Sequence, residues 1–185
     1  MPNKLISKST STQTTPAPGD SATLNHPRYK ADREQVIYDY LRGRGVGAVQ
    51  AAGLMGNLAV ESWLNANIKQ VGGGPAYGLA QMEESRQKAM REYNKVPYLF
   101  GSKLTPEEQQ QLDYIIDKGF NGATAARKAF LNAQTVREAS DIITNNYLRP
   151  GKPHLKRRRA MSEYYYDKYA KKKPFSDGYM WNGNN

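Results

Sequence analysis

One glutamate stands in a stretch of the chain that carries almost no other charge. Between residues 45 and 82 the only charged residues are Glu61 and Lys69, although charged residues make up 24% of the whole sequence. On a helix, the neighbours of Glu61 would include Leu58 and Leu64. Apolar neighbours disfavour an ionised carboxyl, and a carboxyl that keeps its proton can protonate a glycosidic oxygen, which makes Glu61 a candidate general acid. The pattern alone favours the simpler alternative, a glutamate with only a structural role at a helix end, because buried carboxylates are often structural.

The composition excludes several other kinds of site. The chain has no cysteine, and its two histidines, His26 and His154, have no partner at ligand spacing, so we expect no metal ion and no cofactor. Residues 45–68 are long enough to span a bilayer but hold too many polar side chains, and residues 1–13 lack the apolar core of a secretory signal. We therefore expect a soluble protein with no membrane span. The net charge of +10 favours polyanionic partners, which include nucleic acid, anionic lipid and the acidic polymers of a bacterial wall.

The central part of the sequence is mostly helical in pattern. Apolar residues recur every three or four positions, and Thr105 with Glu108 and Thr135 with Glu138 have the spacing of capping boxes. Glycines and a proline within residues 71–82 predict a loop or a small β-hairpin instead. The predicted fold class is therefore mainly α, with six or seven helices and one glycine-rich interruption. The clearest helical patterns span residues 31–43, 47–65, 83–94, 105–118, 134–148 and 154–171.

Composition also divides the chain into three parts. Residues 1–30 are rich in serine, threonine and proline, which is typical of a linker or of an arm that lies on a partner. Residues 31–172 hold the helical patterns and are predicted to form one domain. Residues 173–185 form a C-terminal tail, whose aromatic side chains predict that it docks on another surface.

Three segments of the sequence resemble the bacteriophage tail lysozyme family, which belongs to the lysozyme-like superfamily with goose-type lysozymes and soluble lytic transglycosylases. The segments are GLMGNLAVESWLNAN (53–67), AYGLAQM (76–82) and NNYLRPG (145–151). The resemblance covers about residues 31–172 and implies an α+β lysozyme-like catalytic domain. It also implies a bacteriolytic muramidase that needs no cofactor and cleaves the β-1,4 bond between N-acetylmuramic acid and N-acetylglucosamine in bacterial peptidoglycan.

The resemblance assigns roles to individual residues. Glu61 and Ser62 match the acid motif at the C-terminal end of a helix, which makes Glu61 the proton donor and Ser62 a residue that orients it. Tyr77, Gln81 and Tyr147 are carried over as substrate-binding residues.

The sequence departs from the family at the second carboxylate that ordinary glycoside hydrolysis needs. Leu148 stands where the family often has an acidic residue, and no Asp or Glu lies between Glu61 and Glu83. Glu83 and Glu84 are the nearest downstream candidates, although the acidic first turn of a helix explains both more simply. If neither serves, the N-acetyl or the 6-hydroxyl group of the substrate supplies the nucleophile, and the second route makes a lytic transglycosylase. The sequence leaves hydrolase and transglycosylase open.

Three other interpretations compete with this one. Gly45–Gly47 resembles the turn of a helix-hairpin-helix that binds a DNA phosphate, but the helix predicted after it has no Lys or Arg. The basic segment 152–173 offers cations and tyrosines to a nucleic acid, but Met161 and Tyr165 are predicted to pack inward and the charges to be solvated. The sequence therefore argues against a nucleic-acid partner. The third interpretation is a non-catalytic structural virion protein with a lysozyme-like fold, and the presence of Glu61 weighs against it.

The resemblance also implies where the protein acts. Tail lysozymes are components of the phage particle, so we expect this protein in the virion tail, where it opens the wall locally during DNA entry. Residues 1–30 are then expected to lie along other phage tail proteins. An endolysin that stays in the host cytoplasm before lysis is the alternative. The sequence has no recognisable wall-binding repeat, which favours an enzyme carried by a particle.

Overall fold

The structure is a computed structural model that describes residues 17–93, 103–119 and 124–171. This part is mostly helical and contains no β-strand, only isolated bridges that join Lys69 to Tyr77 and Tyr77 to Met82. The mainly α fold class is therefore confirmed, and the glycine-rich interruption is a loop that these bridges hold. The helices are α1 (Ser21–Leu24), η1 (Ala31–Arg33), α2 (Glu34–Gly43), α3 (Ala48–Ser62), α4 (Glu84–Glu92), α5 (Pro106–Lys118), α6 (Thr124–Asn132), α7 (Val136–Ile142), η2 (Ile143–Leu148), α8 (Leu155–Tyr165) and η3 (Tyr166–Ala170). All the predicted helices are present, and α1 and α6 are additional to them.

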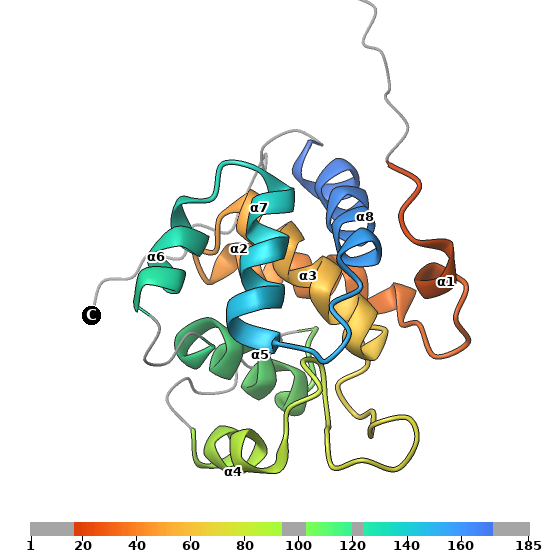
Figure 1. Cartoon of the computed structure of the whole chain (residues 1–185), viewed down its shortest axis with the longest axis vertical. Helices are drawn as coiled ribbons and strands as arrows, with labels where there is room; N and C mark the ends of the chain where they lie inside the picture. Colours follow the sequence, from red (N-terminus) through yellow and green to blue (C-terminus); the bar gives the residue numbers. More distant parts are fainter. Residues whose placement is uncertain (1–16, 94–102, 120–123, 172–185) are drawn as a thin grey trace, which may run out of the picture.

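Helix α3 lies at the centre of the molecule, with α7 and α8 packed against it (Figure 1). Most of its residues are buried, as the apolar pattern of the sequence indicates. A Cβ added to Gly53 would lie 2.8 Å from Ala139 Cβ on α7, and one added to Gly56 would lie 2.5 Å from the backbone nitrogen of Ser162 on α8. A larger side chain does not fit at these distances, so the two glycines allow the helices to approach closely. This packing fixes the direction of the last turn of α3, which carries Glu61.

Both capping signals mark a helix start, but the two caps are built differently. Thr105 Oγ1 accepts the backbone N–H of Glu108, and the Glu108 carboxylate accepts the backbone N–H of Thr105, which completes a capping box at α5. At α7, Thr135 likewise accepts the N–H of Glu138, but the Glu138 carboxylate accepts the N–H of Gln134. The capping box predicted from Thr135 and Glu138 is therefore right about the start of the helix. It is wrong about the second bond of the box, in which the Glu138 carboxylate would accept the N–H of Thr135.

A buried carboxylate ties the start of α2 to the C-terminal helices. Glu34 is 1% exposed, and its oxygens accept from the hydroxyls of Tyr29 and Tyr169 and from Lys168 Nζ, each at 2.6 Å. A buried carboxylate is costly unless its lone pairs are satisfied, and three donors satisfy them here. Since Tyr169 belongs to η3, which continues α8, the cluster holds this pair of helices against α2.

Residues 17–30 contact the helical domain. Asp20 forms an ion pair with Arg157 on α8 at 3.0 Å, and Thr23 is fully buried. Burial raises the pKa of Asp20, but hydrogen bonds from Thr23 and Arg157 outweigh this effect and lower the pKa overall. The described part of the predicted arm therefore lies on the chain's own α8, and the domain boundary at residue 30 stays a prediction.

The glycine turn before α3 uses its own backbone groups internally. Gly45 has a φ of 79°, which glycine adopts without strain. The N–H groups of Gly45 and Val46 donate to the carbonyls of Arg42 and Leu41, each at 3.0 Å, and Arg42 Nη1 donates to the Val46 carbonyl. These N–H groups are not available to a phosphate, which argues further against the helix-hairpin-helix interpretation.

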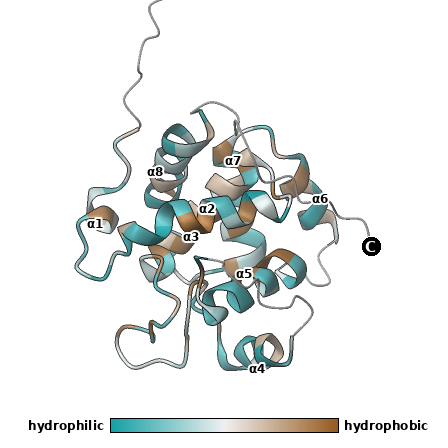
Figure 2. Cartoon of the chain, turned by 180° about the vertical axis from the view of Figure 1, so that it is seen from behind, coloured by the Kyte–Doolittle hydropathy of each residue, from teal (hydrophilic) through white to brown (hydrophobic). Residues whose placement is uncertain are grey.

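Hydrophobic residues gather on α2, α3 and α7, whereas α4 and α8 are mostly hydrophilic (Figure 2). None of the described helices is both long and apolar enough to cross a bilayer. Among the described residues, Val71 and Leu131 are large apolar side chains that stay exposed, at 61% and 57%. Val71 belongs to the loop that precedes α4 and lies in the same pocket lining as Glu61.

Candidate active site

Glu61 lies in the last turn of α3, and the chain leaves the helix directly after it. Trp63 and Leu64 have φ values of 54° and 57°, in the left-handed region that commonly ends a helix. The buried Ser62 hydroxyl donates to the carbonyl of Leu58 within the same helix. Ser62 therefore supports the end of the helix, and any effect it has on Glu61 would pass through the helix backbone.

The carboxylate of Glu61 contacts a buried arginine on α8. Arg158 Nη2 donates to Glu61 Oε1 at 2.7 Å, and the exposed fraction of the side chain is 2% for Arg158 and 16% for Glu61. The other nitrogens of Arg158 donate to Asn57 Oδ1 at 3.2 Å and to the Pro153 carbonyl at 2.7 Å. The guanidinium is thus held by three acceptors and fixes one oxygen of Glu61. No hydrogen bond from the described residues reaches the second oxygen, Oε2.

Asn57 holds Arg158 from the side of α3. Its amide nitrogen donates to the carbonyls of Gly53 at 2.9 Å and Ser140 at 3.1 Å. Its oxygen accepts from Thr144 Oγ1 at 2.8 Å as well as from Arg158. All of these residues are buried, and a buried polar network whose members are satisfied is rigid. The network joins α3, α7 with η2, and α8 behind the carboxylate.

The surroundings of Glu61 therefore differ from the sequence prediction. That prediction considered only neighbours on the same helix, and the expectation that the charges of the basic helix are solvated is wrong for Arg158. A signal for Arg158 did exist, because it lies three residues before Met161 and seven before Tyr165, both of which are buried on α8. The carboxylate therefore contacts a buried cation where the sequence predicted apolar neighbours alone.

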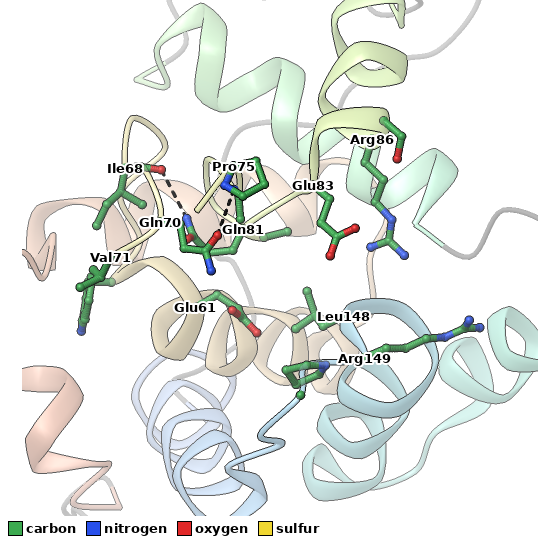
Figure 3. A pocket seen from close by; sticks show the side chains of 16 residues that line it. Glu61, Ile68, Gln70, Val71, Pro75, Gln81, Glu83, Arg86, Leu148 and Arg149 are labelled. Atoms are coloured by element: carbon green, nitrogen blue, oxygen red, sulfur yellow. Dashed lines mark hydrogen bonds between the residues drawn. The ribbon is translucent and has the colours of Figure 1, made fainter. Parts of the chain in front are cut away.

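Glu61 opens into a pocket of about 740 Å³ between the end of α3, the loop that precedes α4 and the turn at residues 148–151 (Figure 3). Of the predicted site residues, Glu61, Gln81 and Glu83 line this pocket. Figure 3 shows the carboxylates of Glu61 and Glu83 on opposite sides of the same space. The volume is that of a typical small-molecule site. The lining also includes residues that neither the sequence pattern nor the resemblance marked as functional: Trp63, Gln70, Arg86, Leu148 and Arg149.

Gln81 is fixed in its loop by its own side chain. Its φ is 44°, an uncommon value for a residue other than glycine. Its Nε2 donates to the carbonyl of Gly78 at 3.1 Å and to that of Ile68 at 3.3 Å, and the second bond is drawn in Figure 3. Because the amide hydrogens are used within the loop, the oxygen Oε1 is the atom that can accept from a ligand hydroxyl.

Glu83 and Glu84 occupy different environments although they are adjacent in the sequence. Glu83 is the N-cap residue of α4, but its side chain makes no capping hydrogen bond, and it lines the pocket. Glu84 lies in the first turn of α4 and does not line the pocket. The simpler explanation, an acidic residue that stabilises a helix start, therefore suits Glu84 better than Glu83. Within residues 17–93, 103–119 and 124–171, no group of three His, Cys, Asp or Glu side chains is placed to hold a metal ion.

Tyr77 and Tyr147 do not line the pocket. The Tyr77 hydroxyl donates to Glu107 Oε1 at 2.7 Å, and burial together with this bond raises the pKa of Tyr77 to about 12. Tyr147 is buried, and burial raises the pKa of its hydroxyl. Arg86 donates to the Tyr147 carbonyl at 3.1 Å and lies 5.2 Å from the centre of its ring. Tyr77 thus anchors the loop to α5 and Tyr147 packs against Arg86, so a direct contact of either tyrosine with substrate stays a prediction.

The comparison with known protein families agrees with this geometry. Residues 32–169 match the family model described as phage tail lysozyme. This range contains all the residues of the pocket and the buried Arg158. No curated protein sequence matches the chain significantly.

Proposed function

The chain belongs to the phage tail lysozyme family, and we propose that it is a muramidase that cleaves the β-1,4 bond between N-acetylmuramic acid and N-acetylglucosamine in peptidoglycan. One observation carries this proposal, namely the placement of Glu61. Its carboxylate faces the pocket while the buried Arg158 holds one of its oxygens. A carboxyl at a fixed position in a groove is the group that glycoside cleavage requires as its acid.

In the proposed reaction Glu61 acts through Oε2, because Oε1 accepts from Arg158. The proton on Oε2 passes to the glycosidic oxygen while the bond between this oxygen and the anomeric carbon breaks, and the bonding electrons stay on the departing oxygen. The anomeric carbon gains oxocarbenium character and is attacked by water or by a group of the substrate. The negative charge that develops on Glu61 is stabilised by the guanidinium of Arg158.

We propose Glu83 as the second carboxylate for hydrolysis. It lines the pocket opposite Glu61, and its carboxylate forms no hydrogen bond or ion pair with other described residues, so the carboxylate oxygens are available to take a proton from water. Glu83→Gln is expected to lower the rate of hydrolysis by about 10²-fold, the typical contribution of a general base. Release of soluble fragments from purified peptidoglycan measures this rate. Glu84→Gln is the matched control and should stay within about twofold of the wild type, because Glu84 lies outside the pocket lining.

The masses of the released fragments test the proposed function and separate the two reaction types. Fragments with reducing ends identify a hydrolase, and fragments with 1,6-anhydro ends identify a lytic transglycosylase. In the second case the 6-hydroxyl of the substrate attacks the anomeric carbon, and a carboxylate at residue 83 is not needed. Full activity of Glu83→Gln would therefore remove Glu83 from the mechanism. A wild-type protein that releases no fragment from peptidoglycan would contradict the muramidase proposal itself.

We also propose that the protein is a component of the phage tail and acts on the wall during DNA entry. Family membership and the serine-, threonine- and proline-rich composition of residues 1–16, the part of the predicted arm that lies outside the described residues, support this proposal. Mass spectrometry of purified phage particles is expected to detect the protein at a constant ratio to known tail proteins. If the protein is absent from particles but abundant in late lysates, it is an endolysin instead.

A further inference from the structure

A second hollow, of about 460 Å³, adjoins the pocket that contains Glu61. Ile68, Gln70 and Val71 line both hollows. Figure 3 shows Ile68 and Val71 at the end of the pocket that lies away from Glu83. The second hollow therefore continues the groove in this direction, where a bound glycan strand would extend beyond the bond that is cleaved.

Besides Ile68, Val71 and Gly72, the second hollow is lined by two cations and three side-chain amides, and no Asp or Glu is among its lining residues. Arg28 and Lys69 are exposed there, and neither forms an ion pair within the described part of the chain. Asn65 Oδ1 accepts the backbone N–H two residues later at 3.0 Å, and Gln70 Oε1 accepts the backbone N–H of Ala76 at 3.2 Å. A backbone N–H can only donate, so these bonds fix the orientation of both amides. Their NH₂ groups remain as donors, which suits a ligand that offers acceptors.

Arg28 is held at this groove by the tryptophan that follows the acid motif. The ring of His26 stacks on that of Trp63 with 3.8 Å between centroids, and the Arg28 guanidinium lies 5.9 Å from the Trp63 ring. The N–H of Lys30 donates to the Trp63 carbonyl at 2.9 Å. Trp63 itself lines the pocket, so this segment is attached directly to the candidate active site. The family match begins at residue 32, which makes Arg28 an addition to the groove from outside the matched range.

We propose that the second hollow binds a carboxylate carried by an N-acetylmuramic acid residue of the glycan, with Arg28 as its main cation and Lys69 as a second one. The proposal deepens the proposed function and rests on it, because the same groove would hold the same strand. A neutral sugar needs no cation, but muramic acid carries carboxylates on its peptide stem or, where the stem has been removed, on its lactyl group. A guanidinium with nearby amide donors matches the oxygens of a carboxylate.

The test compares the binding of three soluble tetrasaccharides to the full chain with Glu61→Gln, with and without Arg28→Ala. The first is the neutral oligomer of N-acetylglucosamine, the second is a peptidoglycan fragment with peptide stems, and the third is that fragment after an amidase has exposed the lactyl carboxylates. Arg28→Ala is expected to raise the dissociation constant for a carboxylate-bearing fragment about three- to tenfold and to change that for the neutral oligomer less than twofold. The fragment that loses affinity identifies the source of the carboxylate. The difference in dissociation constant between the proteins with and without Arg28→Ala should shrink as salt is added.

Arg127→Ala is the control, because it removes the same charge from the exposed surface of α6, outside both hollows. It should leave all three dissociation constants unchanged. The proposal would be overturned if Arg28→Ala lowered the affinity for the neutral and the charged tetrasaccharides equally, or if it lowered the affinity for none of them. If Arg28→Ala lowers the melting temperature, Arg28→Gln is used instead, because it keeps most of the side chain. This variant should show the same loss of affinity for the carboxylate-bearing fragments. Binding needs no turnover, so a wild-type protein that binds the fragments but never cleaves peptidoglycan contradicts only the muramidase proposal.

Discussion

Glu61→Gln is expected to lower the rate of peptidoglycan cleavage by about 10² to 10⁴-fold, the range that a general acid contributes. Glutamine has the shape of glutamate and can still accept the hydrogen bond from Arg158 Nη2, but its amide cannot give a proton to the glycosidic oxygen. The melting temperature should therefore fall less than in Arg158→Met, because the amide oxygen keeps the hydrogen bond although the buried guanidinium loses its counter-charge. Clearing of cell-wall suspensions and thermal unfolding measure the two quantities.

Glu163→Gln is the matched control for this variant. Glu163 also accepts from an arginine on the surface of the helical domain, Arg137, but it lies outside the pocket lining. Its replacement should leave wall clearing unchanged. Full activity of Glu61→Gln would remove Glu61 from the mechanism. A wild-type protein that fails to clear walls would favour the structural virion protein with a lysozyme-like fold.

The sequence predicted most helices because their signals are contained in a few adjacent residues. Thr105, Pro106 and Glu108 together specify the start of α5, and the structure has the complete capping box. The acid position was also predictable, because the charge-free stretch around Glu61 reflects the burial of α3. Helix α6 has a weaker pattern, since Phe130 is its only buried residue. An element with so little buried surface leaves little periodicity to detect.

The contacts between distant segments could not be predicted from spacing. Arg158 and Glu61 are 97 residues apart in the sequence. Residues 156–159 are Lys-Arg-Arg-Arg, which by itself indicates a solvated face. Consecutive helical residues point about 100° apart, so Arg157 and Arg159 stay partly exposed and pair with Asp20 and Asp141, while Arg158 alone of the three is buried. A basic run thus contains one residue whose surroundings differ entirely from those of its neighbours.

Sequence spacing also does not distinguish Glu83 from Glu84. Both follow the glutamine motif and precede a helical pattern, so their sequence signals are nearly identical. The structure separates them, because the extended backbone at Glu83, with ψ of 164°, directs its side chain to the pocket before α4 begins. A difference of one position relative to the start of α4 therefore determines which of the two carboxylates is a candidate for the reaction.

Arg158→Met is expected to lower the free energy of unfolding by about 3 kcal/mol and the melting temperature by roughly 6–12 °C. Methionine fills part of the volume but donates no hydrogen bond, so Asn57 Oδ1 and the Pro153 carbonyl each lose a buried donor. Glu61 loses the group that holds its Oε1, so its carboxylate is less well positioned for the glycosidic oxygen. We therefore also expect kcat to fall about tenfold or more while KM stays within about twofold. Urea unfolding and steady-state kinetics on soluble glycan fragments measure these changes.

Arg157→Met separates this effect from the general loss of a cation on α8. Arg157 pairs with Asp20 at 3.0 Å, but 35% of its side chain is exposed, so the expected cost is about 1 kcal/mol or less, with kcat unchanged. Arg158→Lys should fall between the two in stability, because an ammonium keeps the charge but not the planar set of donors that reaches three acceptors. If Arg157→Met and Arg158→Met lowered the free energy of unfolding equally, the burial of Arg158 would not explain its contribution to stability. A less stable Arg158→Met with unchanged kcat would show that Arg158 supports the fold without positioning Glu61.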